Sequence, residues 1–171
     1  MLGLRPYKKC DAEKIVSWCR DEKIFNYWGG YRFGTFPVTA DVMNDKYFGN
    51  NGDCVEEDNF YPVTAFDETG VVGHFIMRYV NGDRKQLRFG WVIVDDSKRG
   101  QKIGQNMLRL GFKMAFDIMQ VRSVTIGVFE ENTAAMKCYL TAGFEVNEEE
   151  EPVYEEIDGR KMKIIELIKK R

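Results

Sequence analysis

The chain contains an uninterrupted strand, turn and helix pattern in the segment Trp91-Val92-Ile93-Val94-Asp95-Asp96-Ser97-Lys98-Arg99-Gly100-Gln101-Lys102-Ile103-Gly104-Gln105-Asn106-Met107-Leu108. The first four residues are apolar and predict a buried strand, and the polar turn after them contains Gly100 and Gly104. The first backbone N–H groups of a helix lack partners within the helix, and the helix dipole places partial positive charge there. The segment is therefore typical of an anion site, although a plain strand-to-helix loop shows the same pattern.

The residues on either side of this segment predict how it is packed. The strand Leu87–Val94 alternates apolar residues on one face and is also apolar on the other face near its end, which predicts a position in the middle of a sheet. The helix has one apolar face, with apolar residues three or four positions apart at Ile103, Met107, Leu110, Met114 and Ile118. Because Val121–Phe129 predicts the next strand, a crossover should make the two strands parallel neighbours.

The rest of the chain alternates between strand and helix patterns, which predicts a mixed α+β fold. An antiparallel meander is expected from Tyr61–Phe66, Val71–Val80 and Leu87–Val94, which are separated by turn residues. A C-terminal hairpin is expected to turn at Asp158-Gly159. Near the N-terminus we expect a short strand at residues 2–8 and a helix over residues 11–21 capped by Asp11, then a short helix and loop, and a further helix capped by Thr39 or Asp41.

Composition narrows the class of protein. The 171 residues favour a single domain over 1–171, and the net charge of -2 argues against a nucleic-acid partner bound through a basic surface. The four cysteines form no C-x-x-C pair and the chain has one histidine, so no structural metal site is expected. No apolar run reaches the length of a membrane span, so we expect no membrane association and a cytoplasmic protein.

Two familiar phosphate-binding motifs are absent from this turn, and the turn is similar to a third motif. The sequence has neither G-x-x-x-x-G-K-[ST] nor G-x-G-x-x-G in this turn. The turn instead resembles the pyrophosphate motif of the GNAT family of N-acetyltransferases, [Q/R]-x-x-G-x-[G/A]. Arg99 takes the first position and Gly104 the last, while Lys102 replaces the usual middle glycine. We expect Lys102 to offer its backbone N–H in a helical conformation, and its ammonium group to reach a phosphate.

The resemblance extends to a second signature of the same family. Asn132 follows the strand 121–129 and opens a helix that contains Tyr139 and ends in Gly143-Phe144. Seven residues separate Asn132 from Tyr139, which is nearly two helical turns, so both side chains project from one face. The two signatures together cover about residues 87–144.

The resemblance implies a fold and a co-substrate. The fold would be a single-domain GNAT fold, with a mostly antiparallel twisted sheet of six or seven strands, a splayed parallel pair at its centre and about four flanking helices. Acetyl-CoA would lie in the opening and no metal would be needed. The implied contacts are the pantetheine arm on the backbone of Val92, Ile93 and Val94, the pyrophosphate on Arg99, Gly100, Gln101, Lys102, Ile103, Gly104 and Gln105, and the pantetheine or acetyl end on Asn132.

The implied reaction is direct attack of an amine on the thioester, which requires proton transfers at the amine and at the departing sulfur. Tyr139 matches the family's general acid, although a tyrosine simply packed on the sheet is the alternative. Family members often place a glutamate on one of the splayed strands, but Arg88 and Gly127 stand at the matching positions. His74 or Glu130 could replace it as general base, and a water chain to solvent or an amine that binds neutral is an equal alternative.

The acceptor is less well defined by the sequence. The N-terminal segment is most similar to the branch of the family that contains ribosomal-protein N-terminal acetyltransferases, so a small amine or a peptide N-terminus are both candidate acceptors, and a homodimer is possible. The aromatic, glycine-rich segment 21–35 could form an acceptor wall or simply pack in the core. The alternative function is a non-catalytic acyl-CoA-binding or regulatory module, and a nucleotide binder unrelated to CoA is a third.

Overall fold

One eight-stranded sheet runs through the protein. The structure is a computed structural model that describes residues 1–171. The strand order is β1-β2-β3-β4-β5-β8-β6, with β7 paired to β8 beside β6. The strands are β1 (Gly3–Pro6), β2 (Tyr61–Asp67), β3 (Gly70–Val80), β4 (Asp83–Val94), β5 (Ser123–Phe129), β6 (Glu145–Val146), β7 (Val153–Ile157) and β8 (Arg160–Lys170).

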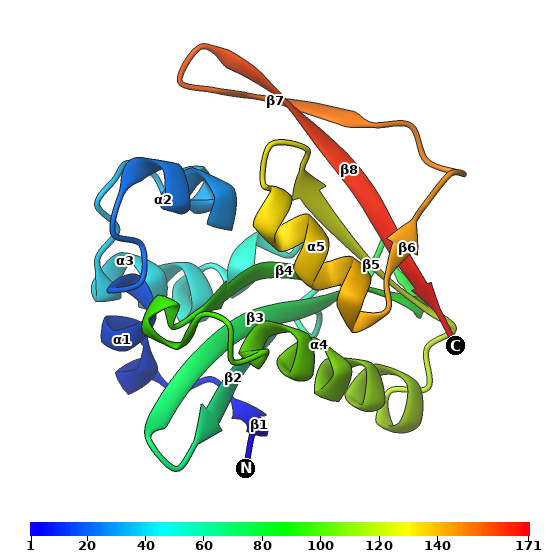
Figure 1. Ribbon diagram of the computed structural model, residues 1–171, viewed down its shortest axis with the longest axis horizontal. Coiled ribbons are helices and arrows are strands. Elements are labelled where there is room, and N and C mark those ends of the chain that lie inside the picture. The colour runs from blue at the N-terminus through cyan, green and yellow to red at the C-terminus, as the bar shows by residue number, and fades with distance from the viewer.

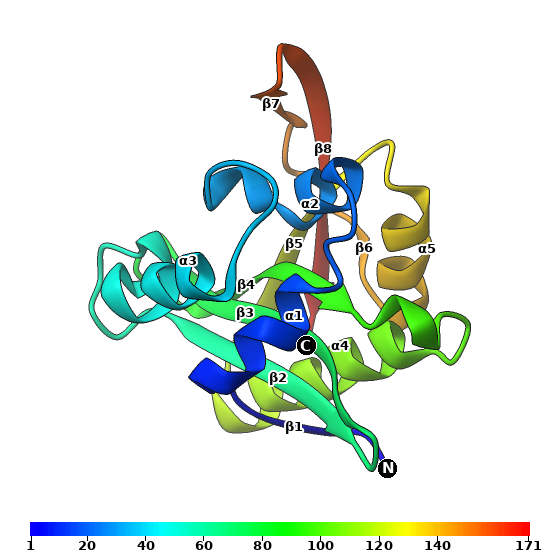
Figure 2. The same ribbon diagram turned by 90° about the vertical axis from the view of Figure 1, so that its left-hand side faces the viewer.

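Helices cover both faces of this sheet (Figures 1 and 2). On one face lie α1 (Ala12–Val16), α2 (Glu22–Trp28) and α3 (Ala40–Asn44), and on the other lie α4 (Ile103–Lys113) and α5 (Thr133–Ala142). Turns of π-helix extend α3 and α4, over Asp45–Gly49 and Met114–Ile118. None of these helices combines the length and the apolar composition that crossing a bilayer would require.

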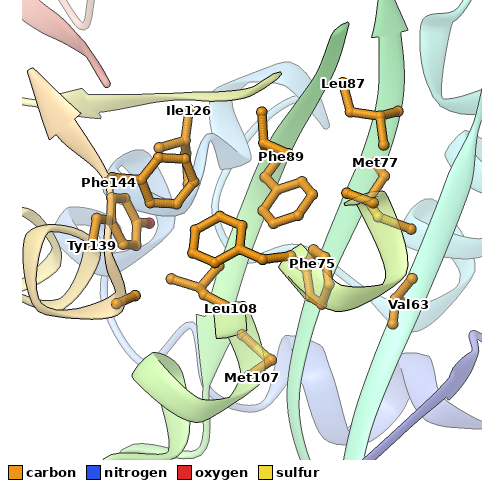
Figure 3. Close-up of a cluster of buried hydrophobic side chains, with 14 of the residues drawn as sticks. Val63, Phe75, Met77, Leu87, Phe89, Met107, Leu108, Ile126, Tyr139 and Phe144 are labelled. Carbon is orange, nitrogen blue, oxygen red and sulfur yellow. The ribbon is translucent and has the colours of Figure 1, made fainter. Parts of the chain in front are cut away.

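The alternation of side chains along β3 and β4 divides the core in two. Phe75 and Phe89 point toward α4 and α5, where they pack with Met107, Leu108 and Phe144 (Figure 3). Ile76 and Ile93 belong instead to the cluster that holds the apolar residues of α1, α2 and α3. Burial of both faces explains why the sequence of β4 is apolar on both sides near its end.

The parallel pair at the centre separates partway along its length. β4 and β5 are paired from Gln86 opposite Ser123 to Phe89 opposite Ile126, and beyond this point β4 has no partner on that side. The ladder between β3 and β4 is irregular at the same level, and Trp91 has a φ of 46°, as in a β-bulge. The indole Nε1 of Trp28 donates a hydrogen bond of 2.9 Å to the carbonyl oxygen of Trp91, so α2 is fixed at the opening.

These observations confirm the predicted fold class, the antiparallel meander and the parallel central pair. The sheet has eight strands because the C-terminal segment forms the two-residue strand β6 as well as the β7–β8 hairpin, which turns at Asp158-Gly159 as predicted. Thr39 caps α3 through a bond from the Val42 amide.

The prediction for residues 11–21 was wrong in part. The helix α1 ends at Val16 and α2 begins only at Glu22, with Asp21 as its N-cap. Asp11 does not cap α1 with its side chain, because its carboxylate is held by both terminal nitrogens of Arg5, at 2.7 Å each, and by the hydroxyl of Thr64 at 2.9 Å.

A buried histidine lies beneath α3 in the second cluster. His74 is 0 % exposed, and its Nε2 lies 2.7 Å from the hydroxyl oxygen of Tyr47. Burial lowers the pKa of His74 to about 3. Burial alone would raise the pKa of Asp11, but hydrogen bonds from Arg5, Lys8 and Thr64 lower it below its ordinary value.

We therefore expect the protein to lose stability as the pH falls below about 6.5, where the unfolded state gains a proton on His74 that the folded state does not bind. The expected loss between pH 7.5 and pH 5 is about 2 kcal/mol in the free energy of unfolding, measured by urea titration. The variant His74→Gln should lack this dependence, because the chain contains one histidine and the contribution of Asp11 is lost only at lower pH. An equal pH dependence in the variant would contradict this assignment.

Candidate functional site

A cleft of about 750 Å³ opens where β4 and β5 separate. Its walls come from α2, the end of β4, the turn before α4, the start of α4 and the first half of α5. Ten of the eleven predicted co-substrate residues line it, namely Val92, Ile93, Val94, Arg99, Gly100, Lys102, Ile103, Gly104, Gln105 and Asn132. The single strand–turn–helix segment therefore supplies most of one wall.

Gln101 is the exception. It does not line the cleft, and its backbone N–H donates to the carbonyl oxygen of Lys98 at 3.3 Å, which closes the turn. Its amide is therefore already used and its side chain is exposed.

The turn presents a group of unpaired backbone donors to the cleft. The N–H groups of Gly100, Lys102, Ile103, Gly104 and Gln105 have no hydrogen-bond acceptor in the protein, and the first helical bond runs from Asn106 to the carbonyl oxygen of Lys102. Five free donors at the positive end of an eleven-residue helix form a binding site for phosphate oxygens.

The backbone conformation explains why glycine is usual at the position of Lys102. Lys102 has φ 60° and ψ 18°, which is the left-handed region, and Gly100 has φ 80°. The predicted helical conformation of Lys102 is therefore of the left-handed kind. Side chains with a Cβ adopt it at a cost of about 1–2 kcal/mol. Lys102 adopts this conformation at the edge of the cleft, where its N–H group has no acceptor in the protein.

Gly104 has a different role, which is to bring α4 and α5 together. A Cβ on Gly104 would lie 3.0 Å from the Sγ of Cys138 and 3.7 Å from a methyl carbon of Val94. The absence of a side chain at Gly104 therefore lets α5 approach the start of α4.

Positive side chains surround the unpaired amides. Arg99 and Lys102 line the cleft and form no ion pair, whereas Lys98 is paired with Asp67 at 2.9 Å. Asp96 lies on the same wall and pairs with Arg20 at 2.9 Å. Arg99 and Lys102 therefore supply free positive charge beside the amides, and Lys23 of α2, also without an ion pair, supplies it from another wall.

Asn132 begins α5 as its N-cap. Its side-chain oxygen accepts a hydrogen bond of 3.2 Å from the amide of Ala135, while its side-chain nitrogen has no partner in the protein. Capping fixes the side chain against the cleft wall and leaves the amide nitrogen as a donor.

A second cavity of about 200 Å³ lies on the other side of the opening. It is bounded by α2 and the following turn, by the β3 and β4 strands, and by β5 and β8. Four residues line both cavities, namely Tyr27, Trp28, Val92 and Tyr139. The two spaces therefore meet at the point where the central strands part.

Tyr139 is placed at this junction by α5. The residue is 8 % exposed, and its ring lies near that of Phe144 (Figure 3), with 6.3 Å between the ring centroids. Its hydroxyl group makes no hydrogen bond within the protein, and burial raises the pKa of Tyr139 above its ordinary value. The phenol is therefore protonated near neutral pH and able to donate to a bound molecule.

The two predicted general bases lie outside both cavities. His74 is buried beneath α3 against Tyr47, and its low pKa makes it a weak base near neutral pH. Glu130 lies at the surface, paired with Lys163 at 2.8 Å. Neither placement favours a catalytic role.

Several residues of the second cavity were not predicted as site residues. Tyr27 and Trp28 belong to the aromatic segment, which proves to contribute to both the cavity wall and the core, since Phe25 is buried. One signal in the sequence pointed to this cavity, which is that Arg88 and Gly127 stand where family members often place a glutamate. A Cβ on Gly127 would lie 2.7 Å from a guanidinium nitrogen of Arg88, so the glycine makes room for the ion pair between Arg88 and Glu166.

The structure contains no group of three or more histidine, cysteine, aspartate or glutamate side chains arranged to hold a metal ion.

Comparisons with known proteins agree with this geometry. The family described as Acetyltransferase (GNAT) domain matches residues 1–145. The acetyltransferase PseH of Campylobacter jejuni is 21 % identical over 154 residues, which are 90 % of this chain and 91 % of PseH. The finer resemblance to the ribosomal-protein branch is not confirmed by these matches.

Two solved structures share the fold. A spermidine N-acetyltransferase from Vibrio cholerae, in complex with CoA and spermine, has a TM-score of 0.77 at 19 % identity and covers 99 % of this chain and 95 % of its own. The aminoglycoside acetyltransferase AAC(6')-Ib, in complex with coenzyme A, has a TM-score of 0.75 at 16 % identity, with 100 % and 95 % covered. The chain belongs to the GNAT family and is an acetyl-CoA-dependent N-acetyltransferase.

Proposed function

We propose that the 750 Å³ cleft binds acetyl-CoA and that the 200 Å³ cavity admits the amine acceptor, so that the two meet beside Tyr139. The observation that carries this proposal is the junction itself, where Tyr27, Trp28, Val92 and Tyr139 line both spaces. We also propose that residues 1–171 act as one N-acetyltransferase domain.

The residues of the cleft fit the parts of acetyl-CoA. The five free amides at the start of α4 would hold the pyrophosphate, with Arg99 and Lys102 supplying positive charge. The edge of β4 beyond Phe89 lacks a strand partner on the β5 side, so backbone groups from Val92 to Val94 are available to a pantetheine arm. The side-chain nitrogen of Asn132 is a further donor on the opposite wall.

When bound, acetyl-CoA supplies an acetyl group activated as a thioester. Tyr139 would donate a proton to the departing sulfur, because its hydroxyl group is protonated and free of partners in the protein. No imidazole lines either cavity, and Asp53, the one carboxylate of the acceptor cavity, is paired with Lys46 at 2.7 Å. We therefore propose that the amine loses its proton to water that reaches solvent through the acceptor cavity, or that it binds in the neutral form.

The acceptor is a primary amine, and the relatives and the size of the cavity suggest its chemical class. The relatives are described as acting on spermidine or on aminoglycosides, and the resemblance to the ribosomal-protein branch keeps a peptide N-terminus as a candidate. A cavity of about 200 Å³ favours a small molecule or a single terminal residue over a folded surface.

The proposal is tested by calorimetry with acetyl-CoA followed by a screen of amines for release of CoA. We expect binding of acetyl-CoA and turnover with at least one amine. Binding without turnover across the screen would favour the alternative, a regulatory module that holds acyl-CoA. Failure to bind CoA at all would contradict both functions, and competition by ATP would point to a nucleotide binder.

The variant Tyr139→Phe tests the general acid. We expect kcat to fall roughly 100- to 10,000-fold, the range usual for proton transfer by a side chain, while the Kd for CoA stays the same. The matched control is Tyr154→Phe, which removes the hydroxyl group of an exposed tyrosine on β7. Unchanged kcat in Tyr139→Phe would show that Tyr139 only packs on the sheet.

The pair Lys102→Gly and Lys102→Ala tests the strained turn. Both variants remove the ammonium group and should weaken CoA binding equally through lost charge. Because alanine keeps the steric cost of the left-handed conformation, Lys102→Gly should exceed Lys102→Ala by about 1 kcal/mol in the free energy of unfolding. Equal stability of the two variants in urea titrations would argue against this conformation.

A further inference from the structure

Three guanidinium groups line the acceptor cavity. Arg32 comes from the turn after α2, Arg78 from β3 and Arg88 from β4, and Asp53 is the one carboxylate in the lining. The excess of positive side chains in a space of about 200 Å³ distinguishes this cavity from an ordinary packing defect.

Nearby carboxylates neutralise all but one of these charges. Arg32 pairs with Glu155 at 3.2 Å, Arg88 pairs with Glu166, and Asp53 is already paired with Lys46 at 2.7 Å. Arg78 forms no ion pair and donates no hydrogen bond to a carboxylate. One positive side chain in the cavity wall is therefore left without a directly paired carboxylate, although Glu56 is near enough for Arg78 to help lower the pKa of that carboxyl group.

The position of Arg78 in the sheet makes this charge costly. Arg78 lies directly opposite Arg88 in the antiparallel ladder of β3 and β4, and like charges at opposed positions destabilise a sheet. Burial lowers the pKa of Arg78, with the thiol of Cys54 opposing the effect and Arg88 and Arg32 adding to it. Stability alone would favour a neutral or acidic residue here, so the arginine pair indicates a ligand that carries negative charge.

We propose that the acceptor is a primary amine that also carries a carboxylate or phosphate group, and that Arg78, assisted by Arg88 and Arg32, binds that anionic group. The inference rests on the proposed function, since it assigns the smaller cavity to the acceptor. The amine would then point toward the junction beside Tyr139, because the arginines and Tyr139 line the same cavity. A polycation such as spermidine, the substrate named for the Vibrio cholerae enzyme, is disfavoured by the unpaired charge of Arg78.

Matched pairs of small amines test this selectivity. The first pair is O-phosphoethanolamine and ethanolamine, and the second is glycine and glycinamide, with spermidine as the polycation. Binding is measured by calorimetry on protein saturated with CoA, so that the phosphate site of the larger cleft is filled. Acetylation is measured separately with acetyl-CoA. We expect the anionic member of at least one pair to bind roughly 10- to 100-fold more tightly, as a hydrogen-bonded charge contributes.

The variant Arg78→Met should remove most of that preference while the Kd for CoA stays the same. Arg122→Met is the matched control, since Arg122 is exposed, lies just before β5 and forms no ion pair. Urea titration should show Arg78→Met to be at least as stable as the unaltered protein, because a like-charge contact is lost. Arg78→Gln serves if the methionine variant does not fold.

Equal binding of both members of each pair, the absence of binding by any of them, or tighter binding of spermidine would overturn the inference. Unaltered CoA binding and turnover with a neutral amine in the same preparations would leave the proposed function in place. Loss of CoA binding in the unaltered protein would instead remove the proposed function itself.

Discussion

The separation of β4 from β5 beyond Phe89 is the constraint on which the rest of the structure depends. Two parallel strands that stay paired would satisfy each other's backbone groups and leave no room between the two layers of helices. The irregularity at Trp91 and the indole bond from Trp28 stabilise the parted arrangement on the β4 side, and β8 continues to pair with β5 on the other. Both cavities and the placement of Tyr139 follow from this parting.

The turn before α4 shows how the chain balances stability against binding. Its left-handed residue and its unpaired amides each cost free energy in the folded protein alone. Those costs are offset by burial on both faces of the sheet, where Phe75 and Phe89 pack under α4 and Ile76 and Ile93 pack under the N-terminal helices. In the smaller cavity, Arg78 and Arg88 lie opposite each other and likewise cost free energy in the protein alone.

The sequence was sufficient for the fold and for the larger cleft because both depend on local patterns. The segment from Trp91 to Leu108 is continuous, so its strand, turn and helix could be placed without knowledge of distant contacts, and ten of eleven predicted co-substrate residues line the cleft. The acceptor cavity was beyond this approach. Its lining joins Arg78, Arg88 and Ile164, which meet through sheet register, with Tyr27 and Arg32, which the packing of α2 and its following turn brings to them. The sequence likewise offered His74 as a candidate base without revealing that Tyr47, in the turn that extends α3, covers it.

The distribution of tryptophan has a practical consequence for spectroscopy. The chain has three tryptophans, of which Trp18 and Trp28 line the larger cleft and Trp28 and Trp91 line the smaller cavity. Indole emission responds to the polarity and quenching of its surroundings, and every fluorophore of this type lies at one of the two spaces. Intrinsic fluorescence can therefore follow occupancy of the protein without an attached dye.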